Sequence, residues 1–387
     1  MRDAASRAHP AAWSLFAVNG VLYGSWIVQI PAQQARWTLS TGELGVLLSV
    51  LALGTVVAKP AVTALLGRWG LRGCTGLAAI TMMAALAAVA LAPSVPLTAA
   101  ALLVYGSGFG GVDLLMNITG AWIETRRGQP VLSGLHGAFS AGVLVAAGLG
   151  AAALQAGLDA RWLLVGLTGV SALVAAWAVP RLPDSVHAAG ALDAPRPALS
   201  ATVVRLMGLA VCAAFVEGLC IDWGAAYLVG TQRATLAQGA AGYAAFAGSM
   251  VVTRFAGDGL TRRLGPDRLA VVAGTVLLAG LSLATLRVSV PVTQAALLLC
   301  GVGVAVLAPL TFSAAGRAPH AAVMAWVSTA FLAGFLIAPG VTGAVTQLGS
   351  LALAFVPGMV LTVIVLALRR TLAAGRPAGE VSPLTGP

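Results

Sequence analysis

The residues of this sequence that could do chemistry stand out most clearly in one apolar stretch, residues 108–128. It reads GFGGVDLLMNITGAWIETRRG and carries Asp113, Asn117 and Glu124. At about 100° per residue, these three side chains and Gly120 fall on one narrow stripe of a helix. An ionised carboxylate at bilayer depth costs about 3 kcal/mol on insertion scales, so we interpret the stripe as functional, facing a cavity or a partner. The alternative is a structural salt bridge between packed helices.

Other polar residues recur in apolar segments at helical spacing. Asn19, Tyr23 and Trp26 form one face of a helix at i, i+4 and i+7. Trp26 and Trp223 lie deeper in their segments than the remaining tryptophans. Hydrogen-bonding groups beside an aromatic face suit a small polar solute. An Asn or Tyr inside a helix bundle can also serve only to join helices.

A second apolar segment carries two acids, Glu217 and Asp222. They are about 140° apart around a helix, so both cannot face one cavity squarely. A carboxyl group in apolar surroundings takes up a proton near neutral pH more readily than it does in water. Such a group can couple solute movement to a proton gradient. We expect Asp113 or Glu217 to do so, and we favour Glu217 over Asp222, which lies nearer the outer mouth and can gate or pair there.

The chain that positions these residues is predicted to be an integral membrane protein. Of its 387 residues, 59% are hydrophobic and only 9% are charged, with a mean hydropathy of +0.94. A soluble protein carries about 25% charged residues. The long apolar runs show no strand alternation, so the spans are helices. Motifs for a metal, a nucleotide phosphate or a nucleophile–base pair are lacking, so we expect no enzyme, no cofactor and no ATP-driven pump.

We predict twelve helical spans in two sets of six, each long enough to cross a ~30 Å hydrocarbon core. The first set lies near residues 12–34, 43–66, 74–92, 97–125, 132–156 and 161–180, and the second near 203–229, 236–262, 268–287, 292–315, 320–347 and 351–370. These sets define an N-terminal bundle, residues 1–180, and a C-terminal bundle, residues 201–370. A polar cytoplasmic linker, residues 181–200, joins them, and we expect the tail, residues 371–387, to be disordered.

Basic residues set the orientation of these spans. With a cytoplasmic N-terminus, sixteen Arg residues fall in inside segments and four in outside segments. The positive-inside rule then places both termini in the cytoplasm. The net charge of +10 reflects this topology, so we expect the lipid bilayer and a small solute as partners, and no nucleic acid.

The two sets of spans repeat each other. An offset of 195 residues places Lys59 on Arg254, and Gly106 on Gly301. Further matches are Gly70 with Gly265, Gly108 with Gly303 and, at an offset of 192, Phe139, Gly142, Gly148 and Gln155 with Phe331, Gly334, Gly340 and Gln347. Six spans per half make the repeats parallel, and a site between two such halves can be opened to either side of the membrane. This mechanism favours a carrier over a channel.

The sequence resembles the major facilitator superfamily over nearly its whole length, and within it the bacterial branch related to the fucose–proton symporter. The matching residues are Asp113, Asn117, Gly120, Glu124, the run Leu135–Gly142 (LHGAFSAG), Glu217, Gly218, Asp222, Trp223, Tyr227, Leu228, Arg254, Gly257 and Asp258. The resemblance implies a carrier of a bacterial inner membrane whose spans 1, 4, 7 and 10 line the cavity. The solute ligands would then be Asn19, Tyr23, Trp26, Asn117 and Trp223.

Two departures limit what the resemblance implies. The superfamily's loop motif after span 2 survives as Gly67, Arg68, Gly70 and Arg72, with Gly67 at the aspartate position, which puts a cytoplasmic latch there in doubt. The fucose carrier has an acid where this chain has Asn19, so fucose itself is not implied.

Charged residues near the cytoplasmic ends of the spans are candidates for a gate. They are Lys59, Glu124, His136, Arg254 and Asp258. Charges of this kind can pair when the inner side is shut and part when it opens. The alternatives are that Lys59 and Arg254 extend towards the lipid headgroups, and that His136 packs at a helix end or relays protons.

Together these features predict an all-α secondary carrier of twelve helices, monomeric, that imports a small polar or sugar-like solute with protons by alternating access. Two alternatives stay open: a proton-coupled exporter of drugs or metabolites, and a membrane sensor that does not transport.

Overall fold

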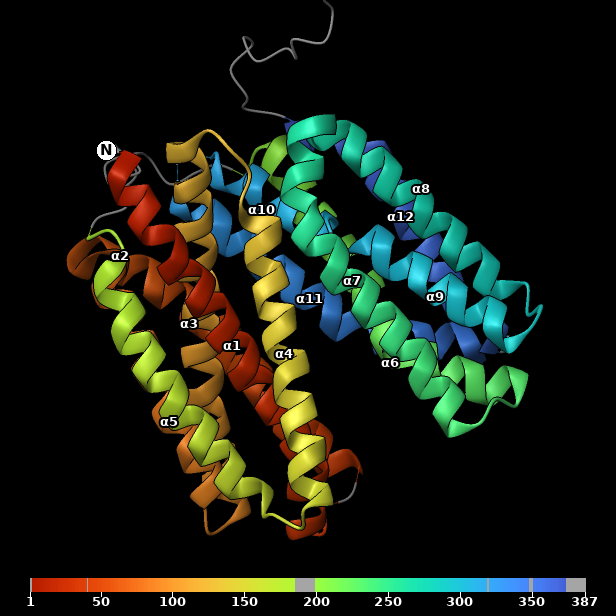
Figure 1. Cartoon of the computed structure of the whole chain (residues 1–387), viewed down its shortest axis with the longest axis horizontal. Helices are drawn as coiled ribbons and strands as arrows, with labels where there is room; N and C mark the ends of the chain where they lie inside the picture. Colours follow the sequence, from red (N-terminus) through yellow and green to blue (C-terminus); the bar gives the residue numbers. More distant parts are fainter. Residues whose placement is uncertain (1, 40, 185–198, 319, 348–350, 374–387) are drawn as a thin grey trace, which may run out of the picture. The chain divides into compact units, whose positions relative to one another are not determined.

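The computed structural model describes residues 2–39, 41–184, 199–318, 320–347 and 351–373, which form helices joined by short turns (Figure 1). Most of the predicted linker, 181–200, and of the predicted tail, 371–387, lies outside the described residues. Each of the twelve predicted spans falls on helical structure where it is described. Among the described residues, nine helical stretches are long and apolar enough to cross a membrane, judged by length and composition.

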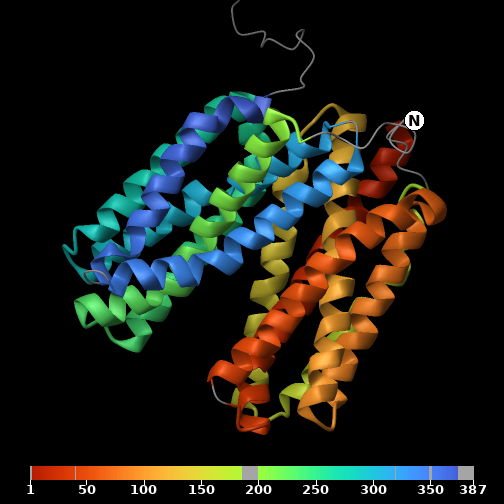
Figure 2. The same cartoon turned by 180° about the vertical axis from the view of Figure 1, so that it is seen from behind.

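The chain divides into two compact units, and the first is built mainly from the N-terminal helices. It comprises Met1–Pro197, Val251–Asp258 and Pro319–Thr329. Its helices are α1 (Arg2–Arg36), α2 (Thr41–Leu91), α3 (Val95–Arg127), α4 (Leu132–Gln155) and α5 (Ala160–Ala178), with short parts of α7 (Leu236–Leu264) and α11 (Ala321–Gln347). Helix α1 packs against α4 and α5 (Figure 1), and α2 runs beside α3 (Figure 2).

The second unit comprises Ala198–Met250, Gly259–Ala318 and Ala330–Pro387. It contains α6 (Ala201–Gln232), α8 (Pro266–Thr285), α9 (Val290–Val304), α10 (Leu307–Gly316), α12 (Val356–Leu368) and the remainder of α7 and α11. Short 3-10 turns are η1 (Val179–Arg181) in the first unit and η2 (Leu351–Phe355) and η3 (Arg369–Ala373) in the second. Helix α12 packs against α6 and α8, and α8 against α9. The domain limits drawn from the sequence stay predictions.

Helix α2 contains two predicted spans, 43–66 and 74–92, joined at Gly70. The backbone of Gly70 has φ 66° and ψ 177°, outside the helical region. Positive φ is costly for residues other than glycine, and a side chain here would also meet the carbonyl oxygen of Asp184. That carbonyl accepts a hydrogen bond from the N–H of Leu71, and Arg72 pairs with the Asp184 carboxylate at 2.7 Å. The surviving part of the loop motif therefore holds the described start of the predicted linker.

Two helical details were not predicted from the sequence. The predicted span 292–315 coincides with one membrane-length stretch, Val290–Gly316, but within it α9 and α10 are separated by residues 305 and 306. Pro309 has no N–H to donate to the carbonyl four residues earlier, which weakens the helix at this point. The predicted tail began at residue 371, but η3 extends through Ala373, where Leu372 is buried and its carbonyl accepts a hydrogen bond from Arg317.

The predicted internal repeat is confirmed by glycine contacts inside each unit. A Cβ on Gly106 of α3 would overlap the carbonyl of Leu51, and a Cβ on Gly301 of α9 would overlap that of Phe246, 195 residues further on. Gly108 and Gly303 meet the backbone of Met82 and Leu277 in the same way, and Gly142 and Gly334 meet the carbonyls of Ala17 and Val211. Gly20 of α1 likewise lies against the carbonyl of Phe139 of α4. Small residues at these positions let helix backbones touch directly.

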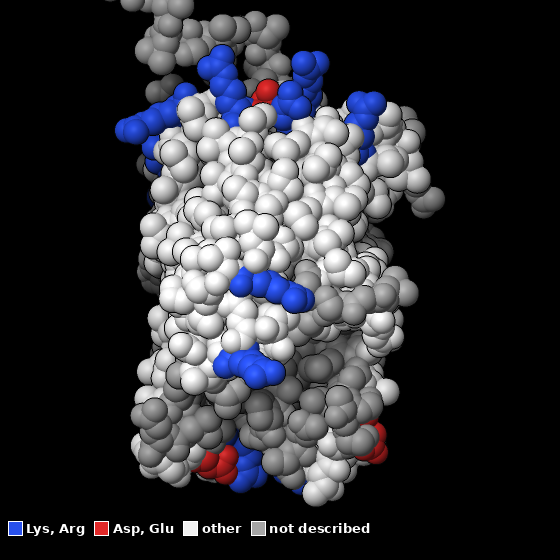
Figure 3. All heavy atoms as spheres, turned by 90° about the vertical axis from the view of Figure 1, so that its right-hand side faces the viewer, with Lys and Arg blue, Asp and Glu red and all other residues white. Residues whose placement is uncertain are grey.

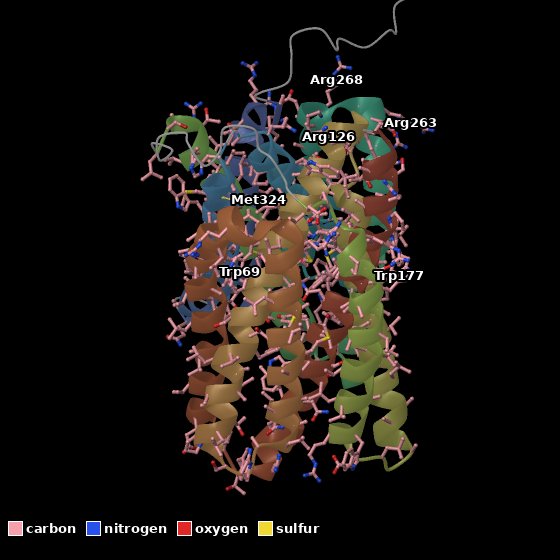
Figure 4. The ribbon with its side chains drawn as sticks, turned by 90° about the vertical axis from the view of Figure 1, so that its left-hand side faces the viewer. Trp69, Arg126, Trp177, Arg263, Arg268 and Met324 are labelled. Carbon is pink, nitrogen blue, oxygen red and sulfur yellow. The ribbon has the colours of Figure 1, made fainter. Side chains whose placement is uncertain are left out.

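The distribution of basic and aromatic side chains on the surface is typical of a membrane protein. On the face drawn in Figure 3, Lys and Arg side chains gather along the upper rim, and the area directly below the rim shows no charged side chains until further Lys or Arg side chains at about mid-height. Trp69 and Trp177 are 54% and 43% exposed and lie at a similar level in Figure 4, below Arg126. Exposed tryptophans beside a basic rim are typical of a membrane–water interface.

Candidate functional site

The first unit contains a buried ionic cluster made by Lys59, Asp113 and Ser328. The Lys59 Nζ donates to the Ser328 Oγ at 2.5 Å and lies 3.3 Å from the Asp113 Oδ2. The Ser328 hydroxyl in turn donates to the Asp113 Oδ2 at 2.7 Å. Helices α2, α3 and the first part of α11 each supply one residue of this cluster. The salt-bridge alternative is therefore the arrangement found for Asp113, whose side chain is 23% exposed.

Lys59 and Arg254 do not extend towards lipid headgroups. Their exposed fractions are 1% and 3%, and both point into the first unit. The Arg254 guanidinium donates to the hydroxyl of Ser140 on α4. Long basic side chains at a membrane surface keep their charge in water, whereas these two bring it into the protein. The headgroup interpretation of both residues is wrong.

Asn117 connects Asp113 to His136 on α4. The Asn117 amide donates to the Asp113 carbonyl at 2.9 Å and to its Oδ1 at 3.3 Å. Its oxygen therefore faces the His136 Nε2, 3.0 Å away, which must carry the hydrogen. The imidazole also contacts Phe16 edge-on, with ring centroids 5.3 Å apart. An amide does not pass protons on, so this contact positions His136 rather than making it a relay.

Two carboxylates bind the N-terminus of α4. The Glu124 Oε1 accepts from the N–H groups of Val131 and Leu132 at 2.8 and 3.0 Å. The Asp258 carboxylate accepts from the N–H groups of Ser133 and Gly134 at 3.0 and 2.8 Å. The first N–H groups of a helix have no intrahelical partner and carry partial positive charge, which explains why acids bind there. Glu124 reaches them from α3, and Asp258 from α7.

Ser133 strengthens the contact between α4 and α7. Its hydroxyl donates to the carbonyl of Arg254 at 2.8 Å. Gly134 and Gly137 of α4 leave room for Asp258 and for the ring of Phe255. Residues 251–258 of α7 are thus held on α4 by both acid–backbone and hydroxyl–backbone bonds.

The predicted solute ligands of α1 face α3 across an aromatic cluster. Tyr23 stacks on Phe109 with centroids 5.2 Å apart, and it lies 6.1 Å from Phe139 of α4. Trp26 is 3% exposed. Asn19 is fully buried, and its amide nitrogen lies 3.5 Å from the Met116 sulfur. The structure brings Asn19, Tyr23 and Trp26 together on one side of α3, the helix that carries Asp113.

The remaining predicted residues lie on α6 in the second unit. Glu217 is 7% exposed, whereas Asp222 lies on the exposed side of the helix, as their angular separation predicts. Gly218, beside Glu217, packs against Phe335 of α11. Trp223 is half-buried and lies near Gly343, also on α11.

Sequence reasoning missed one tyrosine and two serines, and it gave no role to Ser140 within the run Leu135–Gly142. Ser328, Ser133 and Ser140 supply the hydroxyls that bind Lys59, Asp113 and α7, and Tyr105 lies 6.5 Å from Trp26. A lone serine in an apolar run is ordinary in membrane helices and carries no signal. Tyr105 could have been found, because it lies four residues before Phe109 and eight before Asp113.

A match between the sequence and a protein-family model shows the family to which this chain belongs. The model described as the Major Facilitator Superfamily matches residues 12–322. The chain belongs to the Major Facilitator Superfamily. An MFS-type transporter of Yersinia pestis is 30% identical over 351 residues, covering 88% of this chain and 89% of the relative. A transporter of Sinorhizobium fredii is 30% identical over 307 residues, covering 78% and 80%.

Solved structures of the superfamily share the fold. Two crystal structures of FucP, the fucose:proton symporter of E. coli, superpose on this chain with TM-scores of 0.82 and 0.77. They are 15% and 16% identical to it, and cover 94% of this chain and 98% of FucP. This likeness confirms the all-α fold predicted from the sequence. The chain is thus a multi-pass membrane transporter of the Major Facilitator Superfamily, not an enzyme.

Proposed function

We propose that this transporter imports a small polar solute together with protons, by alternating access, across a bacterial inner membrane with both termini in the cytoplasm. The cluster of Lys59, Asp113 and Ser328 carries the proposal. FucP, which shares the fold, is named a fucose:proton symporter, which supports a sugar-like solute and the proton as coupling ion.

Asp113 can link proton uptake to movement because its carboxylate is the centre of the cluster. Ionised, it pairs with Lys59 and accepts the Ser328 hydroxyl. A proton on Asp113 removes the charge that Lys59 faces, and it gives Ser328 a poorer acceptor. Protonation therefore loosens the first part of α11 from α2 and α3. Glu217, buried on α6, is the second candidate for a proton carrier.

The contact of α7 with α4 is the proposed gate. Asp258 and Arg254 hold residues 251–258 of α7 on α4 in this state. We propose that these bonds break when the cytoplasmic side opens. Glu124 and His136 then serve the gate indirectly, Glu124 by binding the start of α4 and His136 by fixing α4 to Asn117.

The proposal is tested by uptake into proteoliposomes with and without an inward proton gradient, using labelled L-fucose, D-xylose, D-glucose and sucrose. Asp113→Asn should lower gradient-driven accumulation at least tenfold but keep solute exchange at equal pH, because asparagine binds no proton. Glu217→Gln is measured in parallel. Asp159→Asn, which changes an exposed acid outside the spans, is the control and should accumulate solute normally.

Each outcome assigns a role. Normal accumulation by Asp113→Asn would remove Asp113 from coupling and leave Glu217 as the proton carrier. Normal accumulation by both variants would contradict proton coupling through these acids. Solute leaving the vesicles against its gradient would indicate an exporter.

A further inference from the structure

The hydroxyl of Tyr105 has no place in the function proposed so far. Its side chain is 0% exposed, and its Oη has no hydrogen-bond partner among the described residues. Buried polar groups almost always have a partner, and a buried hydroxyl without one destabilises the protein. A ligand that reaches this hydroxyl would supply the missing hydrogen bond.

Tyr105 is the polar end of the aromatic cluster between α1 and α3. Its ring centroid lies 6.5 Å from that of Trp26 and 6.3 Å from that of Phe109. Phe109 in turn stacks with Tyr23. Tyr105, Phe109 and Asp113 follow one another every four residues along α3, so the cluster continues directly to the ionic cluster.

A second orphan atom lies at the other end of the aromatic cluster. Asn19 is 0% exposed, and its Oδ1 has no partner among the described residues, while its Nδ2 meets the Met116 sulfur. Asn19 and Trp26 are seven residues apart, about 10 Å along a helix. The amide oxygen needs a donor, and a tyrosine hydroxyl can donate or accept.

We propose that Tyr105 determines solute specificity: its hydroxyl binds an oxygen of the transported solute while Trp26 and Phe109 contact the solute's C–H groups. A sugar ring has hydroxyls at its edge and C–H groups on its face, and so satisfies both kinds of contact. Asn19 accepts from a second hydroxyl. This inference rests on the proposed function, which supplies a polar solute but gives Tyr105 no role.

The test replaces Tyr105 with phenylalanine and repeats the uptake of labelled L-fucose, D-xylose, D-glucose and sucrose. Tyr105→Phe should raise the KM of the transported sugar at least tenfold with little change in the maximal rate, because a site built for a hydroxyl loses one bond. Singly deoxygenated derivatives of that sugar should identify one position at which the wild type discriminates and Tyr105→Phe does not. Without sugar, the variant should melt no lower than the wild type.

Tyr227→Phe is the matched control. Tyr227 is also 0% exposed, but its hydroxyl donates to the carbonyl of Ala284 at 2.9 Å. This variant should melt at a lower temperature and keep the wild-type KM.

The outcomes separate this inference from the proposed function. Sugar uptake by the wild type with an unchanged KM in Tyr105→Phe would overturn the inference alone. A raised KM without dependence on the proton gradient would support the Tyr105 contact and contradict proton coupling. If the wild type takes up none of the four sugars, the solute class is wrong and the assignment of Tyr105 falls with it.

Discussion

Lys59 and Asp113 show how far single residues can be understood from the sequence. Each was recognisable alone, because a charge in an apolar run is rare and costly. Their pairing was not, since 54 positions separate them and helix rotation decides which faces meet. Ser328, which binds both, lies in a mainly apolar stretch whose sequence gives no sign of a polar face. Sequence reasoning therefore found the charges of the site but missed the hydroxyls between them.

At this scale we predict that Lys59→Met destabilises the protein by about 2–3 kcal/mol, since removing one partner leaves the other charge in apolar surroundings. The partial exposure of Asp113 keeps the loss below the roughly 3–5 kcal/mol that is usual for a fully buried pair. The double variant with Asp113→Asn should lose less than Lys59→Met alone. The measurement is the free energy of unfolding in detergent micelles, analysed as a double-mutant cycle.

The exposed pair of Arg161 and Asp159 is the comparison for this cycle. Both side chains are exposed, so the same cycle there should show a weaker coupling than the buried pair. A double variant of the buried pair as unstable as the sum of its single variants would contradict a direct interaction between Lys59 and Asp113.

At the scale of helices, the spacing of glycines predicted which positions pack closely against a neighbouring helix, which hydropathy does not show. Gly106 and Gly301, matched at an offset of 195, each meet a backbone carbonyl of a neighbouring helix in their own unit. Hydropathy located the spans, including the two on either side of Gly70 in α2, but could not find the break between α9 and α10. That break depends on a single backbone position, Pro309, which an averaged profile does not resolve.

We predict that Gly106→Ala destabilises the protein by about 1–3 kcal/mol, because the new methyl group forces α2 and α3 apart. Gly301→Ala should have a similar effect in the second unit. Gly148→Ala is the control, since a Cβ at that position meets nothing within 4 Å, and it should be neutral or slightly stabilising. Thermal unfolding of the three purified variants decides the point, and equal midpoints would refute close backbone packing at Gly106.

At the scale of the whole molecule, the transport cycle requires some contacts to last and others to break. The sequence predicted the family and the alternating-access mechanism, but not which contacts hold this state. The Asp258 carboxylate is one of them, because it joins α7 to two backbone N–H groups of α4. A charge at a helix N-terminus contributes about 1–2 kcal/mol in a partly buried site.

We therefore predict that Asp258→Asn shifts the population towards a state with α7 released from α4, by about five- to thirtyfold. Spin labels at the exposed positions Val145 of α4 and Val252 of α7 report the separation as a distance distribution. Asp159→Asn, which changes an exposed acid that has no contact with α7, is the control and should leave that distribution unchanged. Identical distributions for Asp258→Asn and the wild type would exclude Asp258 from the gate.

The glycines between α1 and α4 limit which motions remain available. Gly20 lies against the carbonyl of Phe139, and Gly142 against that of Ala17, so the two main chains interlock at two levels. Neither helix can slide past the other without a collision of backbone atoms. A covalent cross-link between α1 and α4 should thus be harmless to turnover, and this pair offers a fixed internal reference against which the displacement of every other helix can be measured.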